Sequence, residues 1–259
     1  MTGHELSQAL RNGKRVYGTA ILSTSPRWPG MIAGTGLDFV FIDTEHVPLD
    51  REILSWMCTT YAALGLPAVV RIPEPDPYQA TAVLDGGACG IIAPYMETVE
   101  QAQALRGAVK LRPLKGKRLA EVLEGKALDA DLASYISNRC KNNVLIVNIE
   151  SVPALEALDD ILAVPDVDAI FVGPHDLSTS LGVPEQYNHP RFLEAASTII
   201  AKCRAASVGV GIHYSEGVEQ QLAWAREGAN FILNGSDASH VSRSLTSDIQ
   251  RFHKELGGK

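Results

Sequence analysis

Residues 169–176 read Ala-Ile-Phe-Val-Gly-Pro-His-Asp, and this stretch identifies the class of fold. Four consecutive apolar residues predict a short strand that is buried on both faces, as in a parallel sheet covered by helices. Glycine and proline end the strand, and two ionisable side chains follow immediately. Residues 39–46 repeat this order, because Phe-Val-Phe-Ile is followed by Asp-Thr-Glu-His.

The alternation of short apolar runs with longer amphipathic stretches continues along the chain. It predicts βαβ units and a parallel sheet. Eight strands are predicted, at Gly18–Leu22, Asp38–Ile42, Ala68–Ile72, Gly90–Ala93, Val144–Ile149, Ala169–Val172, Gly209–Ile212 and Phe231–Asn234. Helices are predicted at Arg51–Leu64, Pro77–Asp85, Thr98–Leu111, Val152–Ala163, Pro190–Ser207, Glu216–Glu227 and about Ala238–Leu256. Eight such units predict a closed TIM (β/α)8 barrel of the α/β class.

The length of the chain fits one such domain. The chain has 259 residues, and a TIM barrel typically needs about 250. No break in composition marks a second domain, so residues 1–259 are expected to form one barrel. The stretch Arg112–Asn143 is charged and weakly patterned, and it predicts a long excursion after the fourth strand.

Composition argues against several other classes of protein. A formal net charge of −7 disfavours a general nucleic-acid or membrane surface. The polar segment Met1–Arg15 lacks the apolar core of a signal peptide, and no apolar run reaches the ~20 residues of a membrane span. The four cysteines show no CxxC spacing, which predicts neither a zinc site nor a disulfide framework. A cytoplasmic protein is therefore expected.

Ionisable residues gather where the predicted strands end. In a TIM barrel the active site lies at the C-terminal ends of the strands, so these side chains are expected to face one mouth. They are Asp43, Glu45, His46, Arg71, Glu150, His175, Asp176 and His213.

Glu150 and Asp176 are the predicted metal ligands. They follow adjacent strands, which lie about 4.8 Å apart, so both carboxylates can share one divalent cation. Without a cation, two like charges this close repel, and one carboxyl tends to take up a proton. The alternative is that each carboxylate caps the following helix or pairs with a basic neighbour.

His46 and Arg71 suit catalysis beside such a metal. A histidine can transfer protons near neutral pH, and an arginine can stabilise an enolate oxygen. The alternatives are a loop histidine bonded to backbone, and an ion pair of Arg71 with Glu45 or Asp43. No lysine ends a predicted strand, so a metal is the expected electron sink rather than a Schiff base.

His175 and His213 have two alternative roles. They could add nitrogen ligands and favour a transition metal, or they could contact the substrate. We favour contact with the substrate.

Five segments occur in a fixed order along the chain. They are residues 41–46 (Phe-Ile-Asp-Thr-Glu-His), 69–71 (Val-Val-Arg), 84–88 (Leu-Asp-Gly-Gly-Ala), 147–150 (Val-Asn-Ile-Glu) and 173–178 (Gly-Pro-His-Asp-Leu-Ser). Together they make the chain similar to the HpcH/HpaI aldolase family, the metal-dependent class II 2-oxo acid aldolases. The resemblance extends from Gly18 to about Asp237.

The resemblance implies a role for each matching residue. Glu150 and Asp176 would bind a divalent metal ion, Mg²⁺, Mn²⁺ or Co²⁺. His46 would act as the base, hydrogen-bonded to Asp85, and Arg71 would steady the enolate.

The resemblance also implies a substrate site and an assembly. The substrate carboxylate would lie against the backbone from Gly173 to Asp176. A trimer or hexamer is expected, with the last helix exchanged between subunits. The predicted substrate-binding residues are Asp43, Asn148, Gly173, Pro174, His175 and His213.

Four departures from the family pattern affect the pocket of the second substrate. Residues 111–119 read Leu-Arg-Pro-Leu-Lys-Gly-Lys-Arg-Leu, where the family usually has Arg-Tyr-Pro-Pro-x-Gly-x-Arg-Gly. Asn148 replaces a usual glutamine, His175 replaces a small residue, and His213 stands at an ordinarily apolar strand end. The residues expected to form the enolate are intact.

The predicted function is a metal-dependent carbon–carbon lyase. It would cleave or form a 4-hydroxy-2-oxo acid from two small molecules, pyruvate or a related 2-oxo acid and an aldehyde. One alternative is a related lyase or decarboxylase with a different second substrate. Another is a 2-oxo acid-binding barrel without turnover, which the presence of His46 and Arg71 disfavours.

Overall fold

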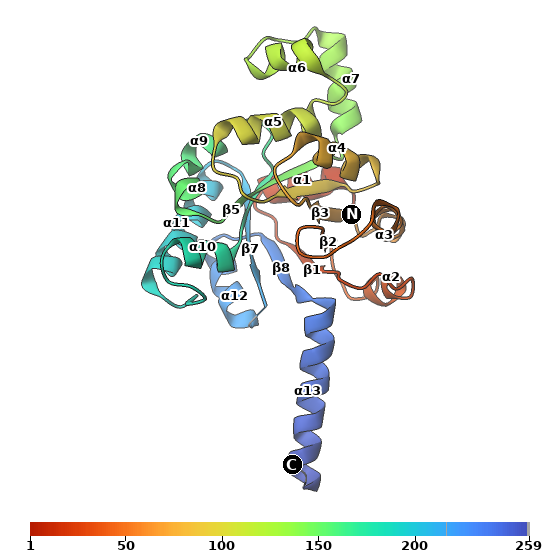
Figure 1. Ribbon diagram of the computed structural model, residues 1–259, viewed down its shortest axis with the longest axis vertical. Helices are drawn as coiled ribbons and strands as arrows, with labels where there is room; N and C mark the ends of the chain where they lie inside the picture. The colour runs from red at the N-terminus through yellow and green to blue at the C-terminus, as the bar shows by residue number, and fades with distance from the viewer. Residues whose placement is uncertain (216, 258–259) are drawn as a thin grey trace.

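The computed structural model describes residues 1–215 and 217–257. Among these residues, eight parallel strands close into a barrel in sequence order (Figure 1). The strands are β1 (Val16–Ala20), β2 (Phe39–Asp43), β3 (Ala68–Arg71), β4 (Gly90–Ala93), β5 (Val144–Ile149), β6 (Ala169–Val172), β7 (Gly209–Tyr214) and β8 (Phe231–Ser236). The predicted single-domain TIM barrel is therefore confirmed.

Helices alternate with the strands and surround the barrel. The helices described are α1 (Gly3–Arg11), α2 (Trp28–Ile32), α3 (Arg51–Ala63), α4 (Pro77–Asp85), α5 (Val99–Lys110), α6 (Gly116–Leu123), α7 (Ala130–Cys140), α8 (Val152–Glu156), α9 (Leu158–Leu162), α10 (Pro174–Ser180), α11 (Pro190–Ala205), α12 (Val218–Glu227) and α13 (Asp237–Leu256). The predicted start of one helix, Glu216, lies outside the described residues.

Aromatic side chains fill the interior of the barrel. The rings of Phe39 and Phe231 stack with centroids 4.7 Å apart, and the ring of Phe171 packs edge-on against Phe231. A Cβ atom on Gly18 would lie 2.3 Å from the ring of Phe39, so only glycine lets β1 pass this ring. The interior is thus a packed core, and the space for a ligand lies above it.

The excursion between α5 and β5 contains two helices that the sequence pattern missed. Asp129 caps α7 by accepting a hydrogen bond from the Leu132 amide. Apolar side chains of α6 and α7 form a small cluster apart from the barrel core. Both ends of the excursion lie at the N-terminal end of the barrel, where Lys110 Nζ donates a 2.7 Å hydrogen bond to the Asn143 carbonyl.

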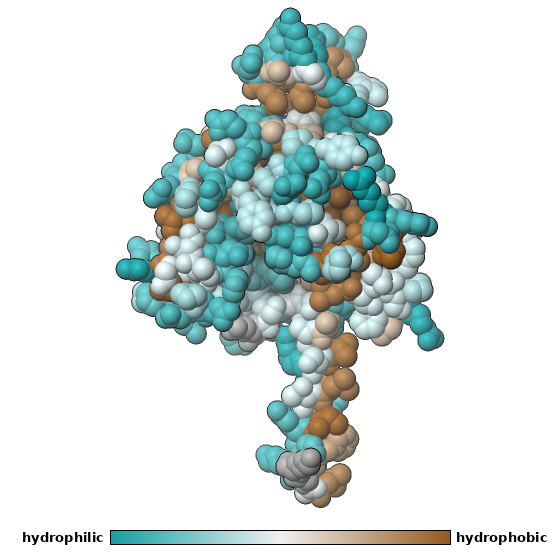
Figure 2. All heavy atoms as spheres, viewed as in Figure 1, coloured by the Kyte–Doolittle hydropathy of each residue, from teal (hydrophilic) through white to brown (hydrophobic). Residues whose placement is uncertain are grey.

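The C-terminal helix α13 projects away from the barrel as an arm (Figure 1). Its apolar side chains lie along one side and face solvent (Figure 2). They are Val241, Leu245, Ile249, Phe252 and Leu256, which are between 44% and 79% exposed. Among the described residues, no helix is long and apolar enough to cross a membrane.

Candidate active site

A cavity of about 660 Å³ opens at the C-terminal ends of the strands. Eight of the predicted site residues line it: Asp43, His46, Arg71, Gly173, Pro174, His175, Asp176 and His213. Aromatic and hydroxyl side chains complete the walls, from Phe171, Tyr187, Tyr214 and Ser215. The parallel topology thus gathers residues from distant parts of the chain at one mouth, as expected.

The carboxylates of Glu150 and Asp176 converge above Gly173. A Cβ atom on Gly173 would lie 2.6 Å from Glu150 Oε2 and 3.6 Å from Asp176 Oδ2. Any side chain at this position would displace the carboxylates, so glycine keeps the space between them open. The structure therefore brings the two predicted metal ligands together.

Hydrogen bonds fix the orientation of Glu150. The backbone amide of Tyr95 donates to Oε1 over 2.7 Å, and the Asn148 amide nitrogen donates to Oε2 over 2.8 Å. Burial nevertheless raises the pKa of Glu150, and the negative charges of Asp176 and Glu45 add to this rise. The positive charge of a bound cation would offset the negative charges of Asp176 and Glu45, and so lower the pKa of Glu150, although it would not restore the lost hydration.

Neither carboxylate caps the helix that follows it. Ser151 caps α8 by accepting a hydrogen bond from the Ala154 amide, and the N-cap residue of α10 is Gly173, which has no side chain to cap the helix. The capping alternative is therefore wrong for both residues.

The oxygen atoms present suit a hard divalent cation. Asn148 Oδ1 is buried and has no hydrogen-bond partner. Among the described residues, no three histidine, cysteine, aspartate or glutamate side chains are grouped to hold a metal. Two carboxylates with water and substrate oxygens are the usual ligands of a magnesium-type ion, so this site fits such an ion.

Arg71 is buried at the floor of the mouth between two carboxylates. Its Nε and Nη2 donate to Asp43 over 2.9 and 2.6 Å, and its Nη1 lies 3.0 Å from Glu45 Oε2. Burial would raise the pKa of Asp43, but the hydrogen bonds and charge of Arg71 outweigh burial and lower it. The alternative ion pairs of Arg71 are thus confirmed, and Arg71 still lines the cavity.

His46 stands at the rim, and its side chain is 62% exposed. Its Nε2 lies 3.7 Å from Glu45 Oε1, within ion-pair range. The predicted hydrogen bond to Asp85 is not formed within the chain. Asp85 ends α4, which returns from the mouth to the N-terminal end of the barrel, and there it pairs with Arg112.

His213 lies under the cavity with its ring between those of Phe41 and Phe171. The ring centroids are 5.9 and 6.2 Å away. Burial, assisted by the charge of Arg71, lowers the pKa of His213 to about 4, although a hydrogen bond to the Gly235 backbone opposes the shift. Its Nε2 is buried without a partner. His213 is therefore a neutral imidazole near pH 7.

His175 is exposed and lies on the far side of the mouth from β2. Its Nδ1 is 3.4 Å from Glu185 Oε1. Within the described chain, neither His175 nor His213 joins the two carboxylates in a group that could hold a metal. Both histidines line the cavity, which the substrate-contact alternative requires.

Two residues at the mouth were missed by the sequence reasoning as members of the site. Glu45 was considered only as an ion-pair partner of Arg71, and Tyr95 was not considered. A hydrogen bond to Glu45 is the largest influence that raises the pKa of Tyr95 to about 12, followed by burial. The available signal was position, since Tyr95 comes two residues after the end of β4.

Residues 111–119, where the chain departs from the family pattern, lie away from this mouth. Arg112, Leu114 and Lys115 line a separate cavity of about 610 Å³ between α4, α5 and the excursion. Within one chain, this stretch therefore does not shape the pocket of the second substrate, contrary to the expectation.

Comparison with known proteins identifies the family of this chain. The family model described as HpcH/HpaI aldolase/citrate lyase matches residues 21–244. A 2-keto-3-deoxy-L-rhamnonate aldolase of Salmonella gallinarum is 30% identical over 254 residues, which cover 97% of this chain and 94% of that protein.

Solved structures show the same architecture. An HpcH/HpaI aldolase from Desulfitobacterium hafniense has a TM-score of 0.83 at 26% identity and covers 98% of both chains. The citrate synthase SbnG has a TM-score of 0.81 at 27% identity, covering 98% of this chain and 99% of that chain.

Proposed function

Because the chain belongs to the HpcH/HpaI aldolase/citrate lyase family, which makes and breaks carbon–carbon bonds, we propose that it is a metal-dependent aldolase. Its reaction is the cleavage or formation of a 4-hydroxy-2-oxo acid, with pyruvate or a related 2-oxo acid and an aldehyde as the products or reactants. The observation that carries this proposal is the convergence of Glu150 and Asp176 over Gly173, beside the buried guanidinium of Arg71.

Electrostatics support the need for a cation. Four carboxylates, those of Asp43, Glu45, Glu150 and Asp176, share the site with the guanidinium of Arg71. An anionic 2-oxo acid would be repelled by this excess of negative charge. Held by Glu150 and Asp176, a Mg²⁺, Mn²⁺ or Co²⁺ ion would offset that charge and polarise the 2-oxo carbonyl.

Arg71 stabilises the oxygen on which negative charge develops. Its guanidinium is fixed by Asp43 and Glu45 before the substrate arrives, so little reorganisation accompanies the reaction. In this proposal, Gly173 and Pro174 lie against the substrate carboxylate. Asn148, His175 and His213 contact the rest of the substrate.

His46 acts as the base in the cleavage direction. It removes the proton of the 4-hydroxyl, the C3–C4 bond breaks, and its electron pair moves to the 2-oxo group to form the enolate of pyruvate. The aldehyde leaves, and protonation of C3 gives pyruvate. A pair of His46 with Asp85 would require Asp85 of another subunit, because within one chain the two residues lie at opposite ends of the barrel.

A second subunit also suits the exposed side of α13. The outer face between β8 and β1 carries a cavity of about 420 Å³ with apolar walls that include Tyr17, Leu222 and Ile232. In a TIM barrel a helix after β8 would cover this face, but α13 points away from it. We infer that α13 of a second copy packs here, in an exchanged trimer or hexamer.

The test of this assembly is the substitution Ile249→Asp on the apolar side of α13. We expect the oligomer seen by light scattering to dissociate, because a charge would be buried in the interface. Asp248→Asn, on the neighbouring polar position, is the control and should leave the mass unchanged. An oligomer that survives Ile249→Asp would contradict the exchange.

The second candidate function is a related synthase or lyase with another acceptor, or a decarboxylase, using the same enolate. The likeness to the citrate synthase SbnG favours it. A binding protein without turnover would keep the carboxylate pair and show no proton chemistry.

The deciding experiment is proton–deuterium exchange of the pyruvate methyl group, followed by NMR. We expect exchange with added Mg²⁺, Mn²⁺ or Co²⁺ and none after chelation. Glu150→Gln and Asp176→Asn should abolish it, while Asp159→Asn, at an exposed carboxylate on α9, should not. No exchange in folded wild-type protein with any of these metals would overturn both enzyme proposals.

A further inference from the structure

The stretch that departs from the family pattern, residues 111–119, lines a second cavity away from the mouth of the barrel. This cavity, of about 610 Å³, lies between α4, α5 and the excursion. Its volume is in the range of small-molecule sites, about 300–1,000 Å³. It shares no lining residue with the cavity at the mouth. Among its lining residues, only Asp85 has a place in the proposed reaction, so the cavity itself has no role there.

The walls of this second cavity are largely apolar. Helix α5 contributes the small side chains of Ala104 and Ala108, and α6 contributes Leu119 and Leu123. A Cβ atom on Gly107 would lie 3.2 Å from both methyl carbons of Leu119, so glycine lets α6 approach α5 closely. Apolar surface is visible where the excursion joins the barrel (Figure 2). Such walls favour a ligand with an apolar body.

Three cationic side chains line the same cavity. Arg112 and Lys115 come from the loop before α6, and Arg139 comes from the end of α7. The Cys140 thiol donates a 3.3 Å hydrogen bond to the Arg112 carbonyl, which ties α7 to this loop. The cations therefore stand on two segments that are joined to each other.

The positive charge of the cavity is only partly balanced. Arg112 pairs with Asp85, and its side chain is only 18% exposed. Within residues 1–215 and 217–257, Lys115 and Arg139 form no ion pair, and both are exposed. The three cations and one carboxylate leave two positive charges in excess, in a chain whose formal net charge is −7. Such a local excess attracts an anion.

We propose that this cavity binds a small amphipathic anion, a monocarboxylate with an alkyl or aryl body. Its carboxylate lies at Lys115 and Arg139, and its body lies between α5 and the leucines of α6. Inorganic phosphate would leave the apolar walls hydrated, and a neutral hydrocarbon would leave both cations without a counter-charge. Binding here needs neither a metal nor the reaction at the mouth.

The test compares octanoate with 1-octanol, which has the same tail without the charge, by isothermal titration calorimetry. We expect one octanoate per chain with a Kd on the order of 1 mM or lower, and weaker binding of 1-octanol. The double variant Lys115→Gln/Arg139→Gln should weaken octanoate binding by roughly three- to tenfold. Its affinity for 1-octanol should stay within about twofold of the wild type, because the apolar walls are intact.

The matched control is Lys117→Gln/Lys141→Gln, which makes the same change in net charge at two exposed lysines outside the cavity. It should leave octanoate binding unchanged. Ala104→Phe fills the space between α5 and α6, so it should abolish binding of both molecules.

Three outcomes would overturn the inference. The first is an equal loss of octanoate affinity in the two double variants. The second is octanoate binding that survives Ala104→Phe, which would place the ligand elsewhere. The third is no binding to the wild type. If light scattering then showed a smaller mass for Ala104→Phe, a second copy of the chain would be the occupant of the cavity.

Discussion

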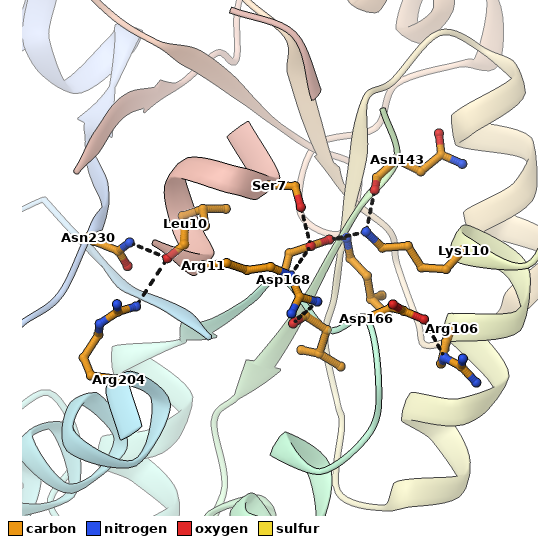
Figure 3. A network of polar contacts seen from close by, with 12 residues as sticks. Ser7, Leu10, Arg11, Arg106, Lys110, Asn143, Asp166, Asp168, Arg204 and Asn230 are labelled. Atoms are coloured by element: carbon orange, nitrogen blue, oxygen red, sulfur yellow. Dashed lines mark hydrogen bonds and ion pairs between the residues drawn. The ribbon is translucent and has the colours of Figure 1, made fainter. Parts of the chain in front are cut away.

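The two ends of the barrel differ in whether their buried polar groups have hydrogen-bond and ion-pair partners. At the N-terminal end, Asp168 is fully buried and each of its oxygens has two partners (Figure 3). Oδ1 accepts from Ser7 Oγ over 2.6 Å and from Arg11 Nε over 3.1 Å. Oδ2 accepts from the Leu145 amide over 2.8 Å and pairs with Lys110.

At the C-terminal end, similar groups are left incomplete. Asn148 Oδ1 and His213 Nε2 are buried without a partner, and burial raises the pKa of Glu150. Each of these features costs stability, which a bound cation and substrate would restore. A buried carboxylate thus indicates structure where its partners are complete, and a ligand site where they are not.

The largest expected effect is on activity at the C-terminal end. Asp176→Asn should reduce aldol turnover by roughly a thousandfold or more, because one of the two proposed metal ligands is lost. The metal-free protein should be no less stable in urea than the wild type, because repulsion from Glu150 is relieved. If the variant unfolded at lower urea concentration than the wild type, Asp176 would stabilise the fold as Asp168 does, and the contrast between the two ends would be wrong.

The next effect is on stability at the N-terminal end. Asp168→Asn should lower the free energy of unfolding by about 3 kcal/mol, because it leaves the cations of Arg11 and Lys110 without their anion. Urea unfolding measures this loss. The folded fraction should keep wild-type kcat, because the site lies at the other end. A large fall in kcat with unchanged stability would contradict the comparison.

The third prediction concerns pH and His213. The pKa of His213 in the folded protein, about 4, lies below the usual 6.5. The contribution of His213 to the free energy of unfolding is therefore complete above pH 6.5 and is lost as the pH falls toward 4. The loss is on the order of 2 kcal/mol after allowance for partial exposure. Arg71 and Asp43 are the charged groups that act on the ring.

The measurement is the free energy of unfolding from pH 7 to pH 4 for wild type and His213→Phe. The variant should lose less stability over this range, since phenylalanine cannot be protonated beside Phe41 and Phe171. Parallel curves for the two proteins would show that His213 is not buried in the neutral form. His4, an exposed histidine of α1, offers the control His4→Gln.

The smallest effect is expected from Ser7→Ala at the N-terminal end. It removes one of the four partners of Asp168, and the loss should be about 1 kcal/mol. Arg11, Lys110 and the Leu145 amide still satisfy the carboxylate. A loss as large as that of Asp168→Asn would mean that the four contacts form one cooperative unit.

The strands were predictable because parallel strands covered on both sides need continuous apolar runs, as in residues 39–42 and 169–172. The order of the strands then placed Glu150, Asp176 and Arg71 at one mouth. Helices α6 and α7 were missed because their apolar residues pack on each other rather than on the barrel. The spacing of their apolar residues therefore differs from that of a helix packed on the barrel.

Two features of the site lie outside what the sequence pattern could place, for physical reasons. Asp85 ends a helix that precedes a strand, and this topology puts it at the N-terminal end, whatever its place in a motif. Tyr95 was missed because its position depends on a φ angle and on a backbone hydrogen bond to Glu150, which lies far along the chain. Residue type and spacing carry neither kind of information.

The arm formed by α13 makes the stability of this fold depend on protein concentration. Its 20 residues extend for about 30 Å, and Asp237 is the only residue of the helix that is buried in the single chain. Where a second copy covers the apolar side, mass action links the stability of the barrel to the supply of partners. Dilution would then act as a denaturant, and a measured melting temperature would describe the assembly as much as the chain.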